Sequence, residues 1–319
     1  MEFDKNIRVY SLLGQRGTFG SVIYELAKDN KKIAVMSADL TRVSGLERYA
    51  EDYPDRYYNV GIAEQNMIGV AAGMADAGRI PFAVTFANFA ALRSNEFVRH
   101  YMSYMNCNIR LVGIGSGFSM GLFGNTHYGI EDIAVLRSMP GITILSPCDG
   151  IETAHCVEWC TNNNVPVYLR LSGQQNNPMV HKKGYKFNFG KGEVLSAGED
   201  VVIYATGSMT SIALKAAEML KEDGITICVI NIHTIKPIDK KLIREKSDYP
   251  LIVTVEEHSR TGGLGSAVAE TLSDIPIKGK VIRMGTGDLY EKAGTYDYML
   301  KKHGLTVEGV ASTVKENLK

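Results

Sequence analysis

The sequence has no excess of charge of either sign and no apolar run that could cross a membrane. Lys plus Arg and Asp plus Glu both number 35 among 319 residues, so we expect no basic surface for nucleic acid or membrane lipid. No apolar run reaches the roughly 20 residues that span a bilayer. The N-terminal M-E-F-D-K-N also lacks the basic and apolar regions of a signal peptide. We therefore expect a cytoplasmic protein that binds neither nucleic acid nor membranes.

Cysteine is scarce, and its distribution matches neither a disulfide framework nor a zinc site. The five cysteines are odd in number and lie mostly in apolar surroundings, without a second Cys pair or a His at zinc spacing. We expect them to be buried structural residues, and we expect no metal site within this chain. They are Cys107, Cys148, Cys156, Cys160 and Cys228.

Apolar strand-like runs alternate with helical patterns along the chain, which predicts an α/β fold with two parallel-sheet domains. The polar, Gly-, Asn- and Lys-rich stretch 173–199 interrupts this pattern and predicts a linker with a short hairpin. The expected domains are therefore 1–172 and 200–319. Expected strands are 33–37, 80–86, 109–115, 142–146 and 165–171, then 201–205, 225–231, 251–256 and 280–285. Expected helices of the first domain are 19–29, 64–77, 89–105, 131–138 and 150–162, with Thr18 and Asp149 as helix caps.

Two glycine-rich segments follow expected strands, where open α/β sheets place ligands. G-G-L-G (262–265) precedes a helix, which suits either phosphate binding or a tight turn, although its spacing is not that of a dinucleotide or P-loop motif. G-I-G-S-G (113–117) opens a long loop that reaches His127. His127 suits either a ligand contact or an ordinary surface position.

A carboxylate opens an otherwise apolar helix. Glu64 in N-V-G-I-A-E-Q-N-M precedes I-G-V-A-A-G-M-A-D-A-G. A helix N-terminus favours an acid for dipole reasons alone. Small apolar neighbours, however, would desolvate the carboxyl group and disfavour its charge, which suits sharing a proton with a weak base.

Four motifs in order make the chain similar to one enzyme family. S-A-D-L (37–40), G-I-A-E-Q-N-M (61–67), T-F-A-N-F (85–89) and G-N-T-H-Y-G-I-E-D-I-A-V-L-R (124–137) resemble the thiamine-diphosphate-dependent transketolases and deoxyxylulose-phosphate synthases. The chain resembles the C-terminal half of a transketolase, a pyrimidine-binding domain followed by the transketolase C-terminal domain. H-T-I-K-P-I-D (233–239) and V-T-V-E-E-H-S-R-T-G-G-L-G-S (253–266) agree with this in the second half.

The resemblance implies roles for nine residues. Glu64 falls on the catalytic glutamate, which hydrogen-bonds the aminopyrimidine of thiamine diphosphate and thereby promotes deprotonation of the thiazolium. His127 falls on a catalytic histidine that contacts the donor substrate. Cofactor contacts are implied for Asp39, Leu40, Phe86, Phe89 and Leu92, and a contact with substrate phosphate for Arg16. The family carries an arginine that contacts substrate just after the last strand of this domain, and this chain lacks it. Arg170 is expected to substitute for that arginine in part.

Three departures from the family pattern affect the expected substrate. Gly115 and Gly173 stand where transketolases carry a histidine and an arginine that contact phosphate, and Phe123 stands in place of an aspartate. The resemblance therefore implies the cofactor chemistry but not a standard pentose phosphate.

The chain lacks the G-D-G motif with which the family binds diphosphate and its metal; its nearest string is G-T-G-D (285–288). The resemblance then implies a split enzyme. This subunit would pair with an N-terminal subunit that holds the diphosphate and Mg²⁺ or Ca²⁺, as an α2β2 assembly with two-fold symmetry.

Three alternatives stay open beside a split transketolase that transfers a two-carbon ketol unit from a ketose to an aldose. The β subunit of a 2-oxo acid dehydrogenase has similar length, but G-I-A-E-Q and G-N-T-H weigh against it. Half of a 1-deoxyxylulose-5-phosphate synthase has a similar C-terminal domain. A non-catalytic paralogue that only binds partners is disfavoured because Glu64, Phe89 and His127 are retained.

Overall fold

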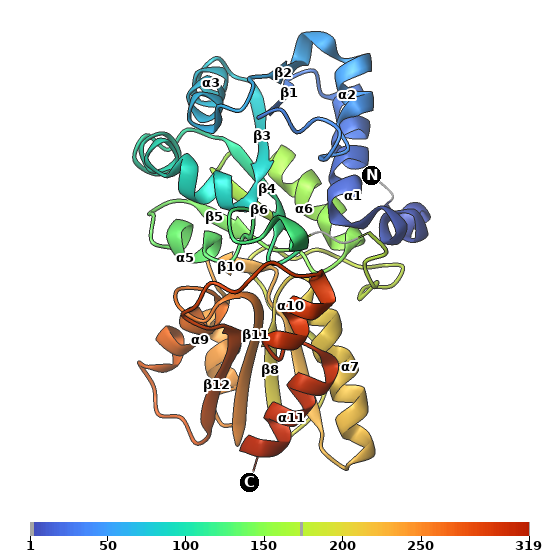
Figure 1. Cartoon of the computed structure of the whole chain (residues 1–319), viewed down its shortest axis with the longest axis vertical. Helices are drawn as coiled ribbons and strands as arrows, with labels where there is room; N and C mark the ends of the chain where they lie inside the picture. Colours follow the sequence, from blue (N-terminus) through green and yellow to red (C-terminus); the bar gives the residue numbers. More distant parts are fainter. Residues whose placement is uncertain (1–2, 173–174, 319) are drawn as a thin grey trace.

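A computed structural model describes residues 3–172 and 175–318. Figure 1 shows two α/β units stacked along the long axis, the first coloured blue to green and the second mainly orange to red. A seven-stranded sheet forms the centre of the first unit and a five-stranded sheet the centre of the second. Within the described part of the chain, no helix has the length and apolar character needed to cross a membrane.

The first sheet is parallel except at one edge, where β10 pairs antiparallel with β5. All five residues of β1 and all seven of β4 are buried, as expected for parallel strands covered on both faces. In spatial order the strands are β10 (Thr234–Lys236), β5 (Thr143–Leu145), β6 (Val167–Ser172), β4 (Arg110–Ser116), β3 (Ile80–Phe86), β1 (Ile33–Ser37) and β2 (Tyr57–Asn59).

The second sheet repeats this plan with β7 as its antiparallel edge strand, paired with β9. The predicted class, two parallel-sheet α/β domains, is therefore confirmed, but the antiparallel edge strands and the short strand β2 were not expected. The strands in spatial order are β12 (Lys280–Thr286), β11 (Leu251–Ser259), β8 (Val201–Ala205), β9 (Ile227–Asn231) and β7 (Glu193–Ser196).

The α-helices cover the faces of both sheets (Figure 1). They are α1 (Ile7–Asp29), α2 (Glu47–Asp52), α3 (Glu64–Asp76), α4 (Asn95–Phe97), α5 (Asp132–Arg137), α6 (Gly150–Asn162), α7 (Met209–Glu222), α8 (Lys240–Glu245), α9 (Leu264–Leu272), α10 (Tyr296–Lys302) and α11 (Val307–Asn317). Short 3₁₀ turns are η1 (Phe3–Asn6), η2 (Pro54–Arg56) and η5 (Gly121–Phe123), and π-helical turns are η3 (Phe89–Arg93) and η4 (Val98–Tyr104).

Helix boundaries differ from the predictions in two places. Thr18 is not a cap: it is buried inside α1, which begins at Ile7 and bends at Gly14 (φ 66°), and its hydroxyl donates to the Tyr10 carbonyl at 3.3 Å. The single helix expected over 89–105 is divided into η3, α4 and η4. Asp149 does cap α6, because its carboxylate accepts from the Glu152 N–H.

The segment between the two units belongs to the second sheet at its C-terminal end. Range 173–199 contains β7, which pairs with β9, so the expected hairpin does not form among the described residues of that range. β10, from the second half of the chain, joins the first sheet beside β5. Each sheet therefore takes its antiparallel edge strand from outside its predicted domain, β7 from the predicted linker and β10 from the second half. The division at 172 and 200 stays a prediction.

His181, in this connecting segment, lies between carboxylates from both units. Its Nδ1 is 3.1 Å from Asp149 at the start of α6, and its Nε2 is 2.7 Å from Glu193 in β7. Burial alone would lower the pKa of His181, but hydrogen bonds to Asp149 and Glu193 and the nearby charge of Glu152 outweigh it and raise the pKa to about 10. The imidazolium thus links α6 to the second sheet.

This arrangement predicts stability that falls in alkaline solution. Folding raises the pKa of His181 from 6.5 to about 10. The stabilisation of the fold by the His181 imidazolium is therefore fully present below about pH 6.5 and is lost as the pH rises through 10. Each pKa unit corresponds to about 1.36 kcal/mol, and solvent near half-exposed Glu193 reduces the effect. We expect a loss of roughly 2–4 kcal/mol in unfolding free energy, measured by urea titration.

His181→Gln should be less stable than the unmodified chain at pH 6.5 and should remove most of the slope between pH 6.5 and 10. His100→Gln, at an exposed histidine, is the control and should leave the slope unchanged. An identical slope in His181→Gln would show that the bridge does not stabilise the fold.

Candidate functional site

A hydrogen-bonded loop fixes the start of α3 and thereby Glu64. Asp39 follows β1 and adopts a left-handed backbone (φ 59°). Its carboxylate accepts from Asn59 Nδ2 at 3.0 Å, while Asn59 Oδ1 accepts from the N–H groups of Asp39 and Gly61. The ends of β1 and β2 are thus joined just before Glu64. Asn59 was not predicted, because the short strand β2 that it ends was not expected.

Glu64 is buried, as predicted, with only 2% of the residue exposed. Its surroundings are not purely apolar, however. Arg93 Nη1 donates to both carboxylate oxygens, at 2.9 and 3.0 Å, and the Thr85 hydroxyl lies 3.4 Å from Oε1. The Arg93 side chain is 44% exposed, so solvent limits this ion pair to about 1 kcal/mol or less. Sequence reasoning missed Arg93 because only the π-helical turn η3 brings it to Glu64.

Two phenylalanines and His127 form an aromatic cluster beside Glu64. The rings of Phe86, at the end of β3, and Phe89, in η3, are 5.8 Å apart and nearly perpendicular. The His127 ring lies 5.6 Å from Phe86 and 5.2 Å from Phe89. The Arg93 guanidinium stacks on Phe89, with Cζ 3.8 Å from the ring centroid. The cluster therefore connects to the carboxylate through Arg93.

The loop after β4 carries His127 to this cluster. Asn88 Nδ2 donates to the Thr126 carbonyl at 2.5 Å, and the Thr126 hydroxyl lies 2.9 Å from His127 Nδ1. Burial and the positive charge of Arg93 lower the pKa of His127, which favours the neutral imidazole near neutral pH. The Phe123 ring lies 5.0 Å from the His127 ring and is 65% exposed.

Gly115 has a conformational reason for lacking a side chain. Its φ is 66°, and a Cβ would come within 3.0 Å of Met120 and 3.2 Å of Phe86. The position at which the resemblance implies a phosphate-binding histidine is therefore shaped here for glycine. The corresponding position at Gly173 lies outside the described residues.

Three other predicted residues of the first unit are Arg16 in α1, Leu40 after β1 and Leu92 in η3. Arg16 follows the bend of α1 and is partly buried, and burial lowers the pKa of its guanidinium. The Arg16 side chain makes no hydrogen bond or ion pair within residues 3–172 and 175–318. Leu40 donates its N–H to the Ser37 hydroxyl, and Leu92 is 48% exposed.

Arg170 does not face this site, contrary to the prediction that it replaces a substrate-binding arginine. Its side chain is 2% exposed, its Nε donates to Asp132 at 2.8 Å, and its Nη2 donates to the Gly129 and Glu257 carbonyls. Asp132 also accepts from Tyr168 at 2.7 Å. Arg170 is committed to a buried contact between the two units.

The G-G-L-G segment is a turn and not a phosphate site. The Glu256 carboxylate accepts from the N–H groups of Leu264 and Gly265 at the start of α9, both at 2.7 Å. A phosphate would need these same donors. Burial raises the pKa of Glu256 to about 7 although these hydrogen bonds oppose the shift.

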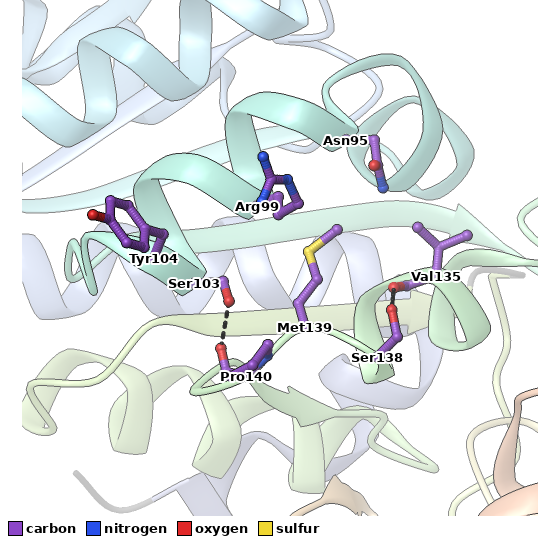
Figure 2. Close-up of a pocket in the computed structure, with 8 residues that line it drawn as sticks. All are labelled: Asn95, Arg99, Ser103, Tyr104, Val135, Ser138, Met139 and Pro140. Atoms are coloured by element: carbon purple, nitrogen blue, oxygen red, sulfur yellow. Dashed lines mark hydrogen bonds between the residues drawn. The ribbon is translucent and has the colours of Figure 1, made fainter.

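One cavity of the first unit lies apart from Glu64. It has a volume of about 650 Å³ between the residues around η4 and those around α5, and none of the predicted site residues lines it. Figure 2 shows Asn95, Arg99 and Tyr104 on one side and Val135, Ser138 and Met139 on the other. Ser103 and Ser138 donate to protein carbonyls there.

Possible metal ligands also lie elsewhere. Among the described residues, sets of three His, Cys, Asp or Glu close enough for one ion occur only around His181, with Cys148 and Asp149 or with Glu152 and Glu193. In the part of the chain that the structure describes, Glu64 belongs to no such set, and its carboxylate is paired with cationic and hydroxyl donors. The site around Glu64 is therefore suited to an organic group.

A buried carboxylate thus lies near aromatic rings at the carboxyl edge of a parallel sheet, where open α/β sheets place ligands. Two family models match the chain: the transketolase pyrimidine-binding domain over residues 14–178 and the transketolase C-terminal domain over residues 190–310. The chain belongs to the transketolase family.

Similar proteins support this assignment along nearly the whole chain. A putative transketolase C-terminal section from Methanocaldococcus jannaschii is 37% identical, covering 96% of each chain. The 6-deoxy-6-sulfo-D-fructose transketolase subunit SqwH of a Clostridium species is 36% identical, covering 94% of this chain and 93% of that one. The 1-deoxy-D-xylulose-5-phosphate synthase of Caldanaerobacter subterraneus subsp. tengcongensis is 35% identical over 94% of this chain but only 48% of its own length.

A solved structure described as a split-gene transketolase, an inactive beta4 tetramer, superposes with a TM-score of 0.87. It is 40% identical, and the match covers 95% of this chain and 98% of that one. The expected family resemblance and fold are thereby confirmed.

The buried contacts of Arg170 predict a structural role that can be measured. Arg170→Met would leave Asp132 buried without its cation, which typically costs about 3–5 kcal/mol. We expect this loss of unfolding free energy by urea titration of the chain alone. Lys278→Met, which removes an exposed pair with Asp248, should change stability by less than about 1 kcal/mol. An Arg170→Met chain of normal stability would reopen the substrate-binding role.

Proposed function

We propose that this chain is the C-terminal subunit of a split transketolase that transfers a two-carbon ketol unit from a ketose to an aldose. The observation that carries the proposal is the placement of Glu64, buried beside the Phe86, Phe89 and His127 rings. A carboxylate there can hydrogen-bond a ring nitrogen of an aminopyrimidine, and the phenyl rings can pack against the ring. Bound thiamine diphosphate would supply the carbon nucleophile that cleaves the ketose.

The chain's own residues divide into two groups in this proposal. Glu64 holds a proton at the pyrimidine nitrogen, in a position shielded from water. Phe86, Phe89, Leu92, Leu40 and Asp39 form the cofactor side of the site. His127, uncharged at neutral pH because burial and Arg93 lower its pKa, can hydrogen-bond the substrate or accept its proton.

A second subunit completes the proposed enzyme. The sequence contains no G-D-G motif for the diphosphate and its metal, and proteins of matching length are named as a transketolase section or subunit. We propose an N-terminal subunit that carries the diphosphate-binding domain and its Mg²⁺ or Ca²⁺, in an α2β2 assembly, acting in the cytoplasm on sugar substrates.

Glu64→Gln should test the catalytic role in the complex with that subunit. The amide keeps the shape of the carboxylate but cannot exchange the proton, so we expect kcat to fall about 100-fold or more, measured as ketol transfer at saturating cofactor. Glu96→Gln, on the same unit and exposed, is the matched control. Circular dichroism should show both variants folded, and activity within a few-fold of the unmodified complex would disprove the role of Glu64.

The anion site of the proposed enzyme depends on few cations. Arg16 has no partner among the described residues and can hold a terminal anion of the substrate, while Gly115 offers no side chain and Arg170 is committed elsewhere. One similar protein is named for a sulfo-sugar, which also bears a terminal anion. We therefore propose a substrate with an anionic or modified end, held chiefly by Arg16.

Matched sugar and sugar-phosphate pairs should show weaker discrimination than a full set of phosphate contacts would give. Each charge-assisted hydrogen bond contributes about 1.5–3 kcal/mol, so we expect kcat/KM to favour the phosphate by well under 1,000-fold, about 4 kcal/mol. Arg16→Met should lower kcat/KM for the charged member roughly 10- to 100-fold and leave the uncharged one unchanged. Arg8→Met, exposed on the same helix, is the control; equal losses for both sugars would contradict the proposal.

A further inference from the structure

Arg93 makes two contacts of the kind that a bound aminopyrimidine would need. Its terminal nitrogen donates to both oxygens of Glu64, at 2.9 and 3.0 Å. Its planar guanidinium lies over the Phe89 ring, with Cζ 3.8 Å from the centroid. A flat cation with N–H donors at its edge therefore uses the same carboxylate and the same aromatic face.

We propose that Arg93 is a positioning residue that occupies the pyrimidine place in the unliganded chain and competes with the cofactor for Glu64. This inference rests on the proposed function, because the competitor is the aminopyrimidine of thiamine diphosphate. Arg93 keeps the Glu64 carboxylate hydrogen-bonded before the cofactor arrives, and it leaves when the cofactor binds.

The two partners differ in their freedom to move. Glu64 is 2% exposed and starts α3, whose preceding loop is held by Asn59, so its carboxylate stays in place. The Arg93 side chain is 44% exposed and stands at the end of the short turn η3. Thr85 donates weakly to Glu64, and His127 is the other titratable side chain influenced by Arg93. Displacement therefore requires movement of Arg93 alone.

Competition between Arg93 and the cofactor lowers the apparent affinity of the enzyme for the cofactor. When the binding-competent state is only a fraction of the population, apparent affinity falls by that fraction. If Arg93 covers Glu64 in about four of five molecules, removal of the guanidinium raises cofactor affinity about fivefold. Removal of a residue that contacts the cofactor productively has the opposite effect, because affinity would fall.

The first experiment measures half-saturating thiamine diphosphate and kcat in the complex with the diphosphate-domain subunit and Mg²⁺. Arg93→Met should lower the half-saturating concentration about three- to tenfold. Arg93→Lys keeps the charge without the planar group, so its half-saturating concentration should lie between those of Arg93→Met and the unmodified complex. Arg99→Met is the matched control, since Arg99 lies six residues on and pairs with exposed Glu96, and it should leave the concentration unchanged. An unchanged or raised concentration in Arg93→Met overturns the proposal.

The second experiment tests the contact itself in the isolated chain, independently of the cofactor. Arg93→Met should lower the thermal unfolding midpoint by about 2 °C, and the shift should be clearly smaller in a Glu64→Gln background, where the stack on Phe89 is still lost but no carboxylate needs the cation. Equal effects in both backgrounds overturn the contact. A complex without cofactor-dependent transfer would instead refute the proposed function, while this cycle would still decide whether Arg93 holds Glu64.

Discussion

Parallel pairing of β1, β3 and β4 is the constraint on which the site depends. Because these neighbouring strands run in one direction, their carboxyl ends meet at the same edge of the sheet. Asp39 follows β1, Phe86 ends β3, and the loop to His127 follows β4. β2 adds the final element, since its register beside β1 places Asn59 next to Asp39 and so fixes the start of α3. A carboxylate, two phenyl rings and an imidazole from distant parts of the chain are thereby collected at one place.

The second unit supports this site without contributing a predicted cofactor residue to it. Glu257, in β11, accepts from the Phe118 N–H at 2.5 Å, and the Glu291 carbonyl accepts from Asn125 at 2.6 Å. Arg170 joins the Gly129 carbonyl of the same loop to the Glu257 carbonyl. The loop 117–129 is therefore held between the two units, and His127 owes its position to both. Asp132 adds the buried charge that keeps Arg170 there.

The sequence was sufficient to predict those elements and residues that follow a local repeating pattern or a family motif. Continuous apolar runs identified the central strands, and Asp149 was recognised as a cap by its chemistry. Thr18 was misassigned because α1 continues past a bend at Gly14 that no periodicity reveals. Antiparallel β7 and β10 were missed because edge strands are short and their partners lie far away in the chain. Arg170 was misassigned for a related reason: a motif gives the place of a residue in a strand, but not whether Asp132 already binds it.

Glu64 imposes one further condition on the chain. A buried carboxylate without donors is costly, and Thr85, at 3.4 Å, is a distant donor. The remaining lone pairs need a hydrogen-bond donor both before and after a cofactor is present. A donor fixed in the fold would satisfy Glu64 before the cofactor binds but would then obstruct the cofactor. A donor on a long, half-exposed side chain can bond Glu64 before binding and move away when the cofactor arrives. Arg93 has this character: its guanidinium is a planar cation that stacks on Phe89, and its side chain is 44% exposed. The dry environment that Glu64 requires is thus compatible with a chain that folds before its cofactor binds.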